Sequence, residues 1–198
     1  GIPSTWFLVD DSGINETTLR DLKKMGGTIQ LHWNRFLFHF NKFGFHFCFR
    51  KLQEQLDRIS KVTETYPTVC RIHYLRWDSD FENLFFLMKD AGIEIDSSFG
   101  PGREQHGYRF GTGFPYFVCD KKGDPIGILE IPFQIHEPMG GASSGDHLRL
   151  LKEAGLKYHT IVVGLFHPYY CLEGGRNYES YKRLLDFTND TSIWCTTL

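Results

Sequence analysis

The sequence lacks any cysteine pair at CxxC or zinc-finger spacing, and its five cysteines are an odd number. An odd count argues against a complete disulfide framework. We interpret the cysteines as mostly buried thiols, which suit a reducing compartment and favour the cytoplasm over the cell envelope. No apolar run reaches the roughly 18 residues of a membrane span. No signal peptide is recognisable either.

An excess of charge of one sign is also missing, because 22 Lys and Arg residues face 24 Asp and Glu residues, giving a net charge of −2. No global field therefore favours nucleic acid or an anionic membrane as a partner. No stretch looks like an interdomain linker, and 198 residues are enough for one domain with a substantial core. We expect a single domain over residues 1–198. The oligomeric state has no signal in the sequence.

Aromatic residues are abundant, at 16% of the chain, and we expect most of them to fill the core. The segment FLFHFNKFGFHFCF, residues 36–49, holds seven Phe and two His. Its near-alternation predicts a strand or extended loop, with a buried helical start as the alternative.

Hydrophobic periodicity predicts a regular succession of strands and helices along the rest of the chain. Strands are expected over residues 4–9, 28–31, 68–73, 93–96, 127–131, 160–166 and 193–196. Helices are expected over residues 16–25, 51–61, 80–90, 143–155 and 178–189. This alternation predicts an α/β fold with a parallel sheet or barrel.

Polar side chains follow several predicted strands at the point where each strand ends. They are His32, then Arg71 with His73, then Asp96 before two serines, and finally His167. Each has a plain structural explanation: a hydrogen-bonded histidine, an ion-paired arginine or an aspartate that caps a turn. Because the carboxyl ends of parallel barrel strands face one side, we expect these groups to converge on one mouth.

Seven segments carry a resemblance to a known family. In chain order they are GIPSTWFLV, GGTIQLHW, RIHYLRW, AGIEIDSS, GYRFGTGFPYFV, LEIPFQI and LFHP. This order resembles the NodB-type polysaccharide deacetylases (carbohydrate esterase family four), above all the divergent branch found beside bacterial cell-surface polysaccharide genes. The resemblance spans nearly the whole chain. It implies a distorted (β/α) barrel that uses a divalent metal, usually zinc, to remove N- or O-acetyl groups from a carbohydrate.

The resemblance also implies roles for individual residues. His32 resembles a metal-binding histidine of the family. Arg71 resembles the arginine that orients the catalytic carboxylate, and His167 resembles the histidine that protonates the leaving group. Many members place a second metal-binding histidine four residues after the first, where this chain has Phe36, which cannot ligate.

The family's first motif is a pair of aspartates, one the base and one a metal ligand, on a strand before the one that residues 4–9 resemble. We expect that this first strand has been lost or lies upstream of Gly1. An alternative is the pair Asp10 and Asp11, with Asp11 as a metal ligand. His39 and His46 are further candidates, because a catalytic zinc takes about three protein ligands.

Other residues are candidates for catalysis or for binding a sugar ring. Asp96 is a further catalytic candidate. We predict that His73, Trp33 and Trp77 bind the substrate, although core packing is the alternative for both tryptophans. Glu137 follows the LEIPF strand closely enough to add a carboxylate to the same mouth.

Three hypotheses remain open from the sequence. The first is a metal-dependent carbohydrate deacetylase of cell-surface polysaccharide metabolism. The second is an inactive protein of the same fold, kept for glycan binding or assembly, which Phe36 and the missing first motif favour. The third is a different (β/α) hydrolase with Asp96 and Glu137 as paired carboxylates.

Overall fold

The structure, a computed structural model, divides into two compact units. Unit 1 comprises Gly1–Ser98, Tyr116–Glu130 and Thr196–Leu198, and unit 2 comprises Phe99–Pro115 and Ile131–Cys195. The expected single domain stays a prediction. The residues that the structure describes are 2–9, 15–34, 44–75, 81–102, 107–109, 111–137, 144–175, 177–190 and 192–198.

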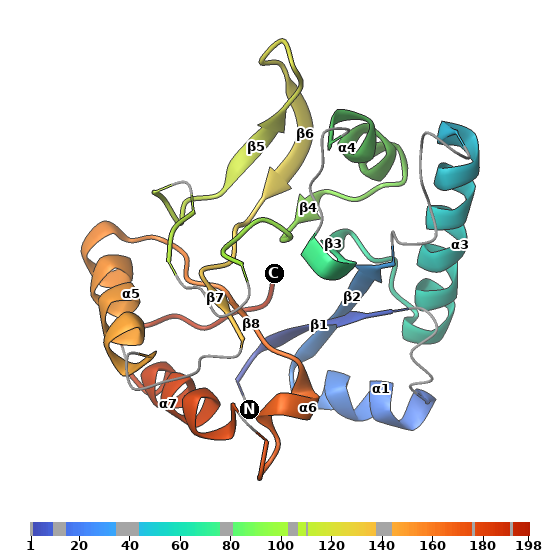
Figure 1. Ribbon diagram of the computed structural model, residues 1–198. Coiled ribbons are helices and arrows are strands. Elements are labelled where there is room, and N and C mark those ends of the chain that lie inside the picture. The colour runs from blue at the N-terminus through green and yellow to red at the C-terminus, as the bar shows by residue number, and fades with distance from the viewer. Residues whose placement is uncertain are drawn as a thin grey trace. The chain divides into compact units, whose positions relative to one another are not determined.

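Unit 1 is built on a six-stranded sheet with the strand order β1-β2-β3-β4-β6-β5 (Figure 1). The parallel strands are β1 (Ser4–Leu8), β2 (Gly27–Trp33), β3 (Val69–Ile72), β4 (Ile95–Asp96) and β6 (Pro125–Glu130). Strand β5 (Tyr116–Cys119) runs antiparallel to β6 and forms an edge. The expected parallel α/β arrangement is therefore confirmed for most of this sheet.

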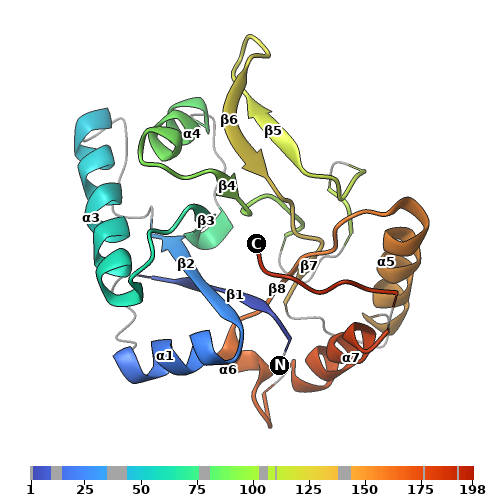
Figure 2. The same cartoon turned by 180° about the vertical axis from the view of Figure 1, so that it is seen from behind.

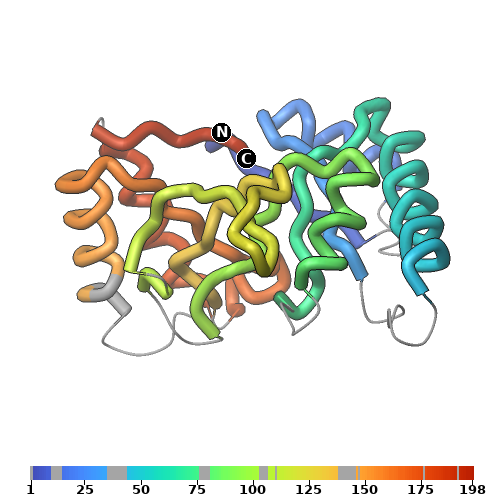
Figure 3. The backbone as a smooth tube through the Cα atoms, turned by 90° about the horizontal axis from the view of Figure 1, so that it is seen from above, coloured from blue at the N-terminus to red at the C-terminus, as the bar shows by residue number. Residues whose placement is uncertain are grey.

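Helices α1 (Glu16–Lys24), α3 (Phe45–Thr63) and α4 (Phe81–Asp90) connect the first four strands. Figure 3 shows α3 and α4 side by side, and their apolar faces join the sheet in one core. Leu52 and Leu56 of α3, and Leu84 and Phe85 of α4, are fully buried there. At about 25 cal/mol per Å² of buried apolar surface, side chains of this size supply most of the unit's stability.

The first turn of α3 corrects the expectation for the Phe-rich segment. Phe45 to Phe49 are helical rather than extended, because Cys48, Leu52 and Leu56 recur at helical spacing and bury one continuous face. The alternative of a helical start is confirmed for these residues, and of the five only Cys48 is buried. Residues 36–43 lie outside the described ranges.

The expected end of α1 at two glycines is confirmed. Gly26 has φ +85°, a left-handed conformation that ends the helix without the strain of a side chain. Gly27 already belongs to β2, and a Cβ there would lie 2.8 Å from the Trp6 ring. The short turn therefore depends on both glycines.

Unit 2 has a two-stranded parallel sheet of β7 (Ile135–His136) and β8 (Gly164–Leu165). Its helices are α5 (Ser144–Tyr158), α6 (Pro168–Cys171) and α7 (Tyr178–Thr188). Figure 2 shows α5 and α7 next to each other, and their apolar residues meet in a small core. That core includes Leu148, Leu151, Leu184 and Phe187.

Two strand predictions near the end of the chain are wrong: one strand is much shorter than expected and the other does not form. The strand expected over 160–166 shrinks to β8, because Ile161 and Val162 are exposed and the Val163 N–H bonds to the Gln134 side chain. Residues 193–196 form no strand, and Trp194 is 86% exposed. Strand-forming side chains without a neighbouring strand have nothing to pair with, so propensity alone does not extend the sheet.

The thiols behave as expected, since Cys48, Cys70 and Cys171 are buried and none of the described cysteines forms a disulfide. Among the helices that the structure describes, none is long and apolar enough to cross a membrane.

Candidate functional site

Polar side chains gather at the carboxyl ends of β2, β3 and β4 in unit 1, as the sequence predicts. Parallel pairing places His32 beside Arg71 and Cys70 beside Asp96 in the sheet. We call this group the strand-end cluster; it comprises His32, Arg71, His73, Asp96, Ser97 and Ser98.

Arg71 is held rigidly within the strand-end cluster. Its Nε donates to the Ser97 carbonyl at 2.7 Å and its Nη2 donates to the Ser97 hydroxyl at 2.8 Å. The guanidinium lies 4.4 Å from the centre of the Phe7 ring, a cation–π distance. Burial lowers the pKa of Arg71 to about 10, while the carboxylates of Asp96 and Glu130 raise it. The group therefore carries a fixed positive charge at neutral pH.

Asp96 organises the turn that follows β4. It is fully buried and its Oδ1 accepts a hydrogen bond of 2.7 Å from the Ser98 hydroxyl. That hydroxyl in turn accepts from the Ile72 N–H at 2.8 Å, which ties the turn to β3. The catalytic role assigned to Asp96 stays a prediction, and the described contacts are those of a residue that positions its neighbours.

Glu130 is a residue of this region that sequence reasoning missed. It is fully buried at the end of β6, next to Asp96 across the sheet, with Tyr116 as its other neighbour. Burial raises the pKa of Tyr116, and Glu130 and Asp96 raise it further. The available signal was a glutamate at the end of the otherwise apolar strand GILEIPF.

His32 and His73 lie against each other. Their ring centres are 4.8 Å apart and the rings are tilted by 55°. The Nδ1 of His32 donates to the Arg71 carbonyl oxygen at 2.8 Å, and both histidines are half-buried. The ring of Tyr74 also stacks on the ring of His73, with ring centres 4.2 Å apart.

Unit 2 contains a hydrogen-bonded carboxylate and imidazole, Glu137 and His167. Glu137 follows β7 directly and His167 follows β8 by two residues, so both leave the same end of this small parallel sheet. Glu137 is 1% exposed; its Oε1 accepts from the Nδ1 of His167, and its Oε2 accepts from the His167 backbone N–H at 2.8 Å. The His167 side chain is 54% exposed. A buried acid thus orients an accessible imidazole.

Two tyrosines on the short helix α6 stand beside His167. The ring of Tyr170 lies 6.2 Å from that of His167, and Tyr169 lies 5.3 Å from Tyr170. Tyr169 is 79% exposed, an unusual state for an aromatic residue. The HPYYC sequence contains this pair, but only the structure shows its exposure next to the imidazole.

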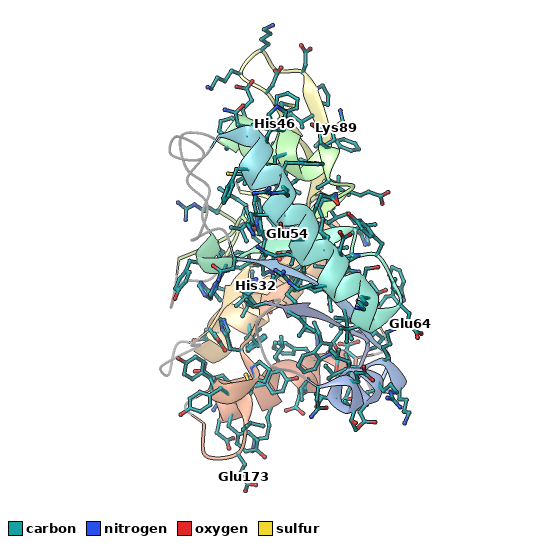
Figure 4. All side chains as sticks on the ribbon, turned by 90° about the vertical axis from the view of Figure 1, so that its right-hand side faces the viewer. His32, His46, Glu54, Glu64, Lys89 and Glu173 are labelled. Atoms are coloured by element: carbon teal, nitrogen blue, oxygen red, sulfur yellow. The ribbon has the colours of Figure 1, made fainter. Side chains whose placement is uncertain are left out.

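Several predicted site residues are placed elsewhere or not described. Trp33 is fully buried in the core of unit 1, which favours the alternative of core packing over its predicted contact with a sugar. His46 is exposed in the first turn of α3, whereas His32 lies on β2 (Figure 4). Asp10, Asp11, Phe36, His39 and Trp77 lie outside the described residues.

His32 has the hydrogen bonding expected of a ligand to the implied divalent metal. A carbonyl oxygen can only accept, so the proton of neutral His32 sits on Nδ1 and the lone pair on Nε2, as is typical of metal-ligating histidines. The donor chemistry therefore fits a zinc-type ion. Within the described ranges, however, no three His, Cys, Asp or Glu residues are grouped to hold one.

No protein-family model matches the chain, and no curated protein matches it. Among solved structures, the chain is similar to a candidate polysaccharide deacetylase from Mycobacterium smegmatis, with a TM-score of 0.69 and 13% identity over 99% of this chain and 69% of that one. It is also similar to Puue allantoinase, with a TM-score of 0.67 and 15% identity over 99% of this chain and 65% of that one.

These similarities establish the class of fold. The protein has the α/β fold of the NodB-type deacetylases of carbohydrate esterase family four, as the resemblance predicts. Identities this low show the fold alone, because one fold carries many activities.

Proposed function

We propose that the protein is a metal-dependent hydrolase that removes acetyl groups from a carbohydrate of the cell surface. The observation that carries this proposal is the Glu137–His167 pair. A buried carboxylate holds an accessible imidazole by its Nδ1, which is the arrangement that prepares a histidine for proton transfer at Nε2.

Acetyl hydrolysis needs a proton for the departing group and stabilisation of the tetrahedral oxyanion. In this proposal His167 donates the proton from Nε2, and Glu137 stabilises the imidazolium by charge and keeps the ring oriented. Arg71 is a positioning residue, since Ser97 holds its guanidinium by two hydrogen bonds. Tyr169 offers a ring face on which a pyranose can stack.

The resident ion of this class would be held in part by His32, whose Nδ1 is already committed to the Arg71 carbonyl. The chemistry that such an ion supplies when bound is Lewis-acid polarisation of the acyl carbonyl and acidification of a water molecule.

The test is release of acetate from N-acetylglucosamine oligomers and from O-acetylated polysaccharide. We expect acetate release by the wild-type protein and a loss of roughly 10²–10⁴-fold in kcat for His167→Ala, the usual contribution of general acid catalysis. A chelator should abolish release, and added zinc should restore it. His159→Gln, which alters an exposed histidine of unit 2, is the matched control.

Acetate release that is unchanged in His167→Ala would contradict the role of the Glu137–His167 pair. If no acetylated carbohydrate is hydrolysed, the deacetylase proposal fails. The exposed Tyr169 then favours the second candidate, an inactive glycan-binding protein of the same fold, whose binding a chelator would leave unchanged.

A third possibility, paired carboxylates at Asp96 and Glu137, gains no support from the contacts. Both side chains are buried, Asp96 with the Ser98 hydroxyl and Glu137 with His167. A glycosidase acid or base must reach its substrate, and these two carboxylates are each engaged within their own unit.

A further inference from the structure

We propose that His73 is the second imidazole ligand of the metal ion that His32 binds. This inference rests on the proposed function for the presence of an ion, and it assigns to that ion a residue for which the sequence predicts only substrate contact. Phe36, at the position of the family's second histidine, cannot serve.

The distance between the two rings fits one shared ion. A zinc ion lies about 2.1 Å from a ligating imidazole nitrogen, and so about 3.2 Å from the centre of that ring. Two imidazoles at a tetrahedral angle on one ion then have ring centres about 5 Å apart. The observed separation of His32 and His73 is 4.8 Å, with the rings tilted by 55° rather than stacked flat.

The hydrogen bond of His32 prepares the pair chemically. Its Nδ1 donates to the Arg71 carbonyl oxygen at 2.8 Å, which places the lone pair of the neutral ring on Nε2, the nitrogen that would bind a metal. That carbonyl belongs to β3, the strand from whose end His73 projects. One strand therefore orients the first ligand and supplies the second.

The backbone after β3 is unusual in a way that fixes His73. Tyr74 has φ 62° and Leu75 has φ 53°, two consecutive left-handed residues without the freedom of glycine. The Tyr74 ring lies against the imidazole of His73, with ring centres 4.2 Å apart and planes 25° apart. Backbone strain of this kind concentrates at functional sites, where it holds a side chain in place.

The pair supplies part of a coordination shell. Among the residues with described positions, no third His, Cys, Asp or Glu joins it in a group. His46, the other described candidate, is exposed in the first turn of α3. The inference therefore distinguishes His73 from His46 as the partner of His32.

The test is a titration of the metal-free full chain with zinc, followed by calorimetry, and with cobalt(II), followed by its visible absorption. The variants are His32→Ala, His73→Ala and His73→Gln, with His46→Ala as the matched control. We expect His32→Ala and both His73 variants to weaken metal binding at least tenfold and to change the cobalt spectrum. His46→Ala should bind like the wild-type protein. Thermal unfolding shows whether each variant is folded, and His73→Gln retains a side chain of similar length.

The inference is overturned if the wild-type protein binds neither metal, or if folded His73 variants bind as tightly as wild type. Acetate release is measured separately, so the two proposals can fail independently. Metal binding that needs both histidines, without acetate release from any acetylated carbohydrate, would leave His73 as a ligand and reject the deacetylase. Metal-dependent acetate release, with unchanged metal binding in the His73 variants, would support the deacetylase and reject His73 as a ligand.

Discussion

At the scale of single residues, ionisable groups lie buried beside one another in unit 1. They make the free energy of unfolding vary with pH in the alkaline range. Burial raises the pKa of the Cys70 thiol well above its ordinary value, and the charges of Asp96 and Glu130 raise it further. The unfolded chain releases this proton near pH 9 while the folded protein retains it. The contribution of Cys70 to the free energy of unfolding is thus fully present below pH 9 and is lost as the pH rises further.

We expect that moving from pH 8 to pH 10 costs about 1.4 kcal/mol of unfolding free energy through Cys70 alone. Arg71 offsets only part of this loss, because burial lowers its pKa to about 10 and the folded protein begins to release that proton, which raises stability, only as the pH approaches 10. Urea unfolding under reducing conditions at both pH values measures the effect. Cys70→Ala should show a pH dependence shallower by this amount, and equal slopes in the two proteins would contradict the assignment.

At the scale of elements, two glutamine side chains complete the hydrogen bonding of short parallel strands. In unit 1 the Oε1 of Gln30 accepts from the Val69 N–H at 3.0 Å, where β3 begins. In unit 2 the fully buried Gln134 accepts from the Val163 N–H at 2.7 Å and donates to the Pro132 carbonyl at 2.7 Å. Side-chain amides here pair backbone groups at strand ends that the ladder bonds of these short strands do not reach.

Gln134→Leu should destabilise the protein by about 1–3 kcal/mol, because it leaves the part-buried Val163 N–H and the buried Pro132 carbonyl without these partners. Gln53→Leu is the control, since Gln53 on α3 is only part-buried and bonds to the accessible Tyr66 hydroxyl. Chemical denaturation at neutral pH measures both. A loss for Gln134→Leu no larger than that for Gln53→Leu would show that the amide is dispensable.

At the scale of the whole molecule, the chain passes from one unit to the other several times. Unit 1 takes β5 and β6 from residues that follow the first segment of unit 2, and takes its last residues from the end of the chain. The Leu198 N–H donates to the Thr5 hydroxyl at 2.8 Å, which joins the two most distant parts of the sequence within unit 1. The strand-end cluster belongs to unit 1 and the Glu137–His167 pair to unit 2, so their expected convergence stays a prediction.

A fragment that ends at Ser98 should therefore not fold cooperatively. It lacks β6, which lies between β4 and β5, and with it Ile126 and Ile128, both almost fully buried in the core. Removing two such side chains and the neighbour of β4 costs several kcal/mol, a large part of a typical domain's stability. A sigmoidal urea transition with native-like circular dichroism in the fragment would show that Gly1–Ser98 is independent of β5 and β6.

Local periodicity explains how much of the fold was predictable. The spacing of Leu19 and Leu22 predicts α1, and that of Leu84, Leu87 and Met88 predicts α4, each to within about two residues, because a helix buries one face by a rule that the sequence displays. The same kind of pattern predicts a strand over residues 193–196, and the structure has none there. A strand needs a partner strand, which no local pattern specifies.

The sequence by itself determined the α/β class and the strand ends on which polar groups stand, while the roles that the resemblance implies for His32, Arg71 and His167 stay predictions. Only the tertiary structure showed which groups meet: Glu137 with His167, 30 residues apart, and the ring of His32 with that of His73. The reason is physical. The hydrophobic pattern of a segment depends on near neighbours, whereas a buried polar contact depends on the register of strands that come together only when the sheet forms.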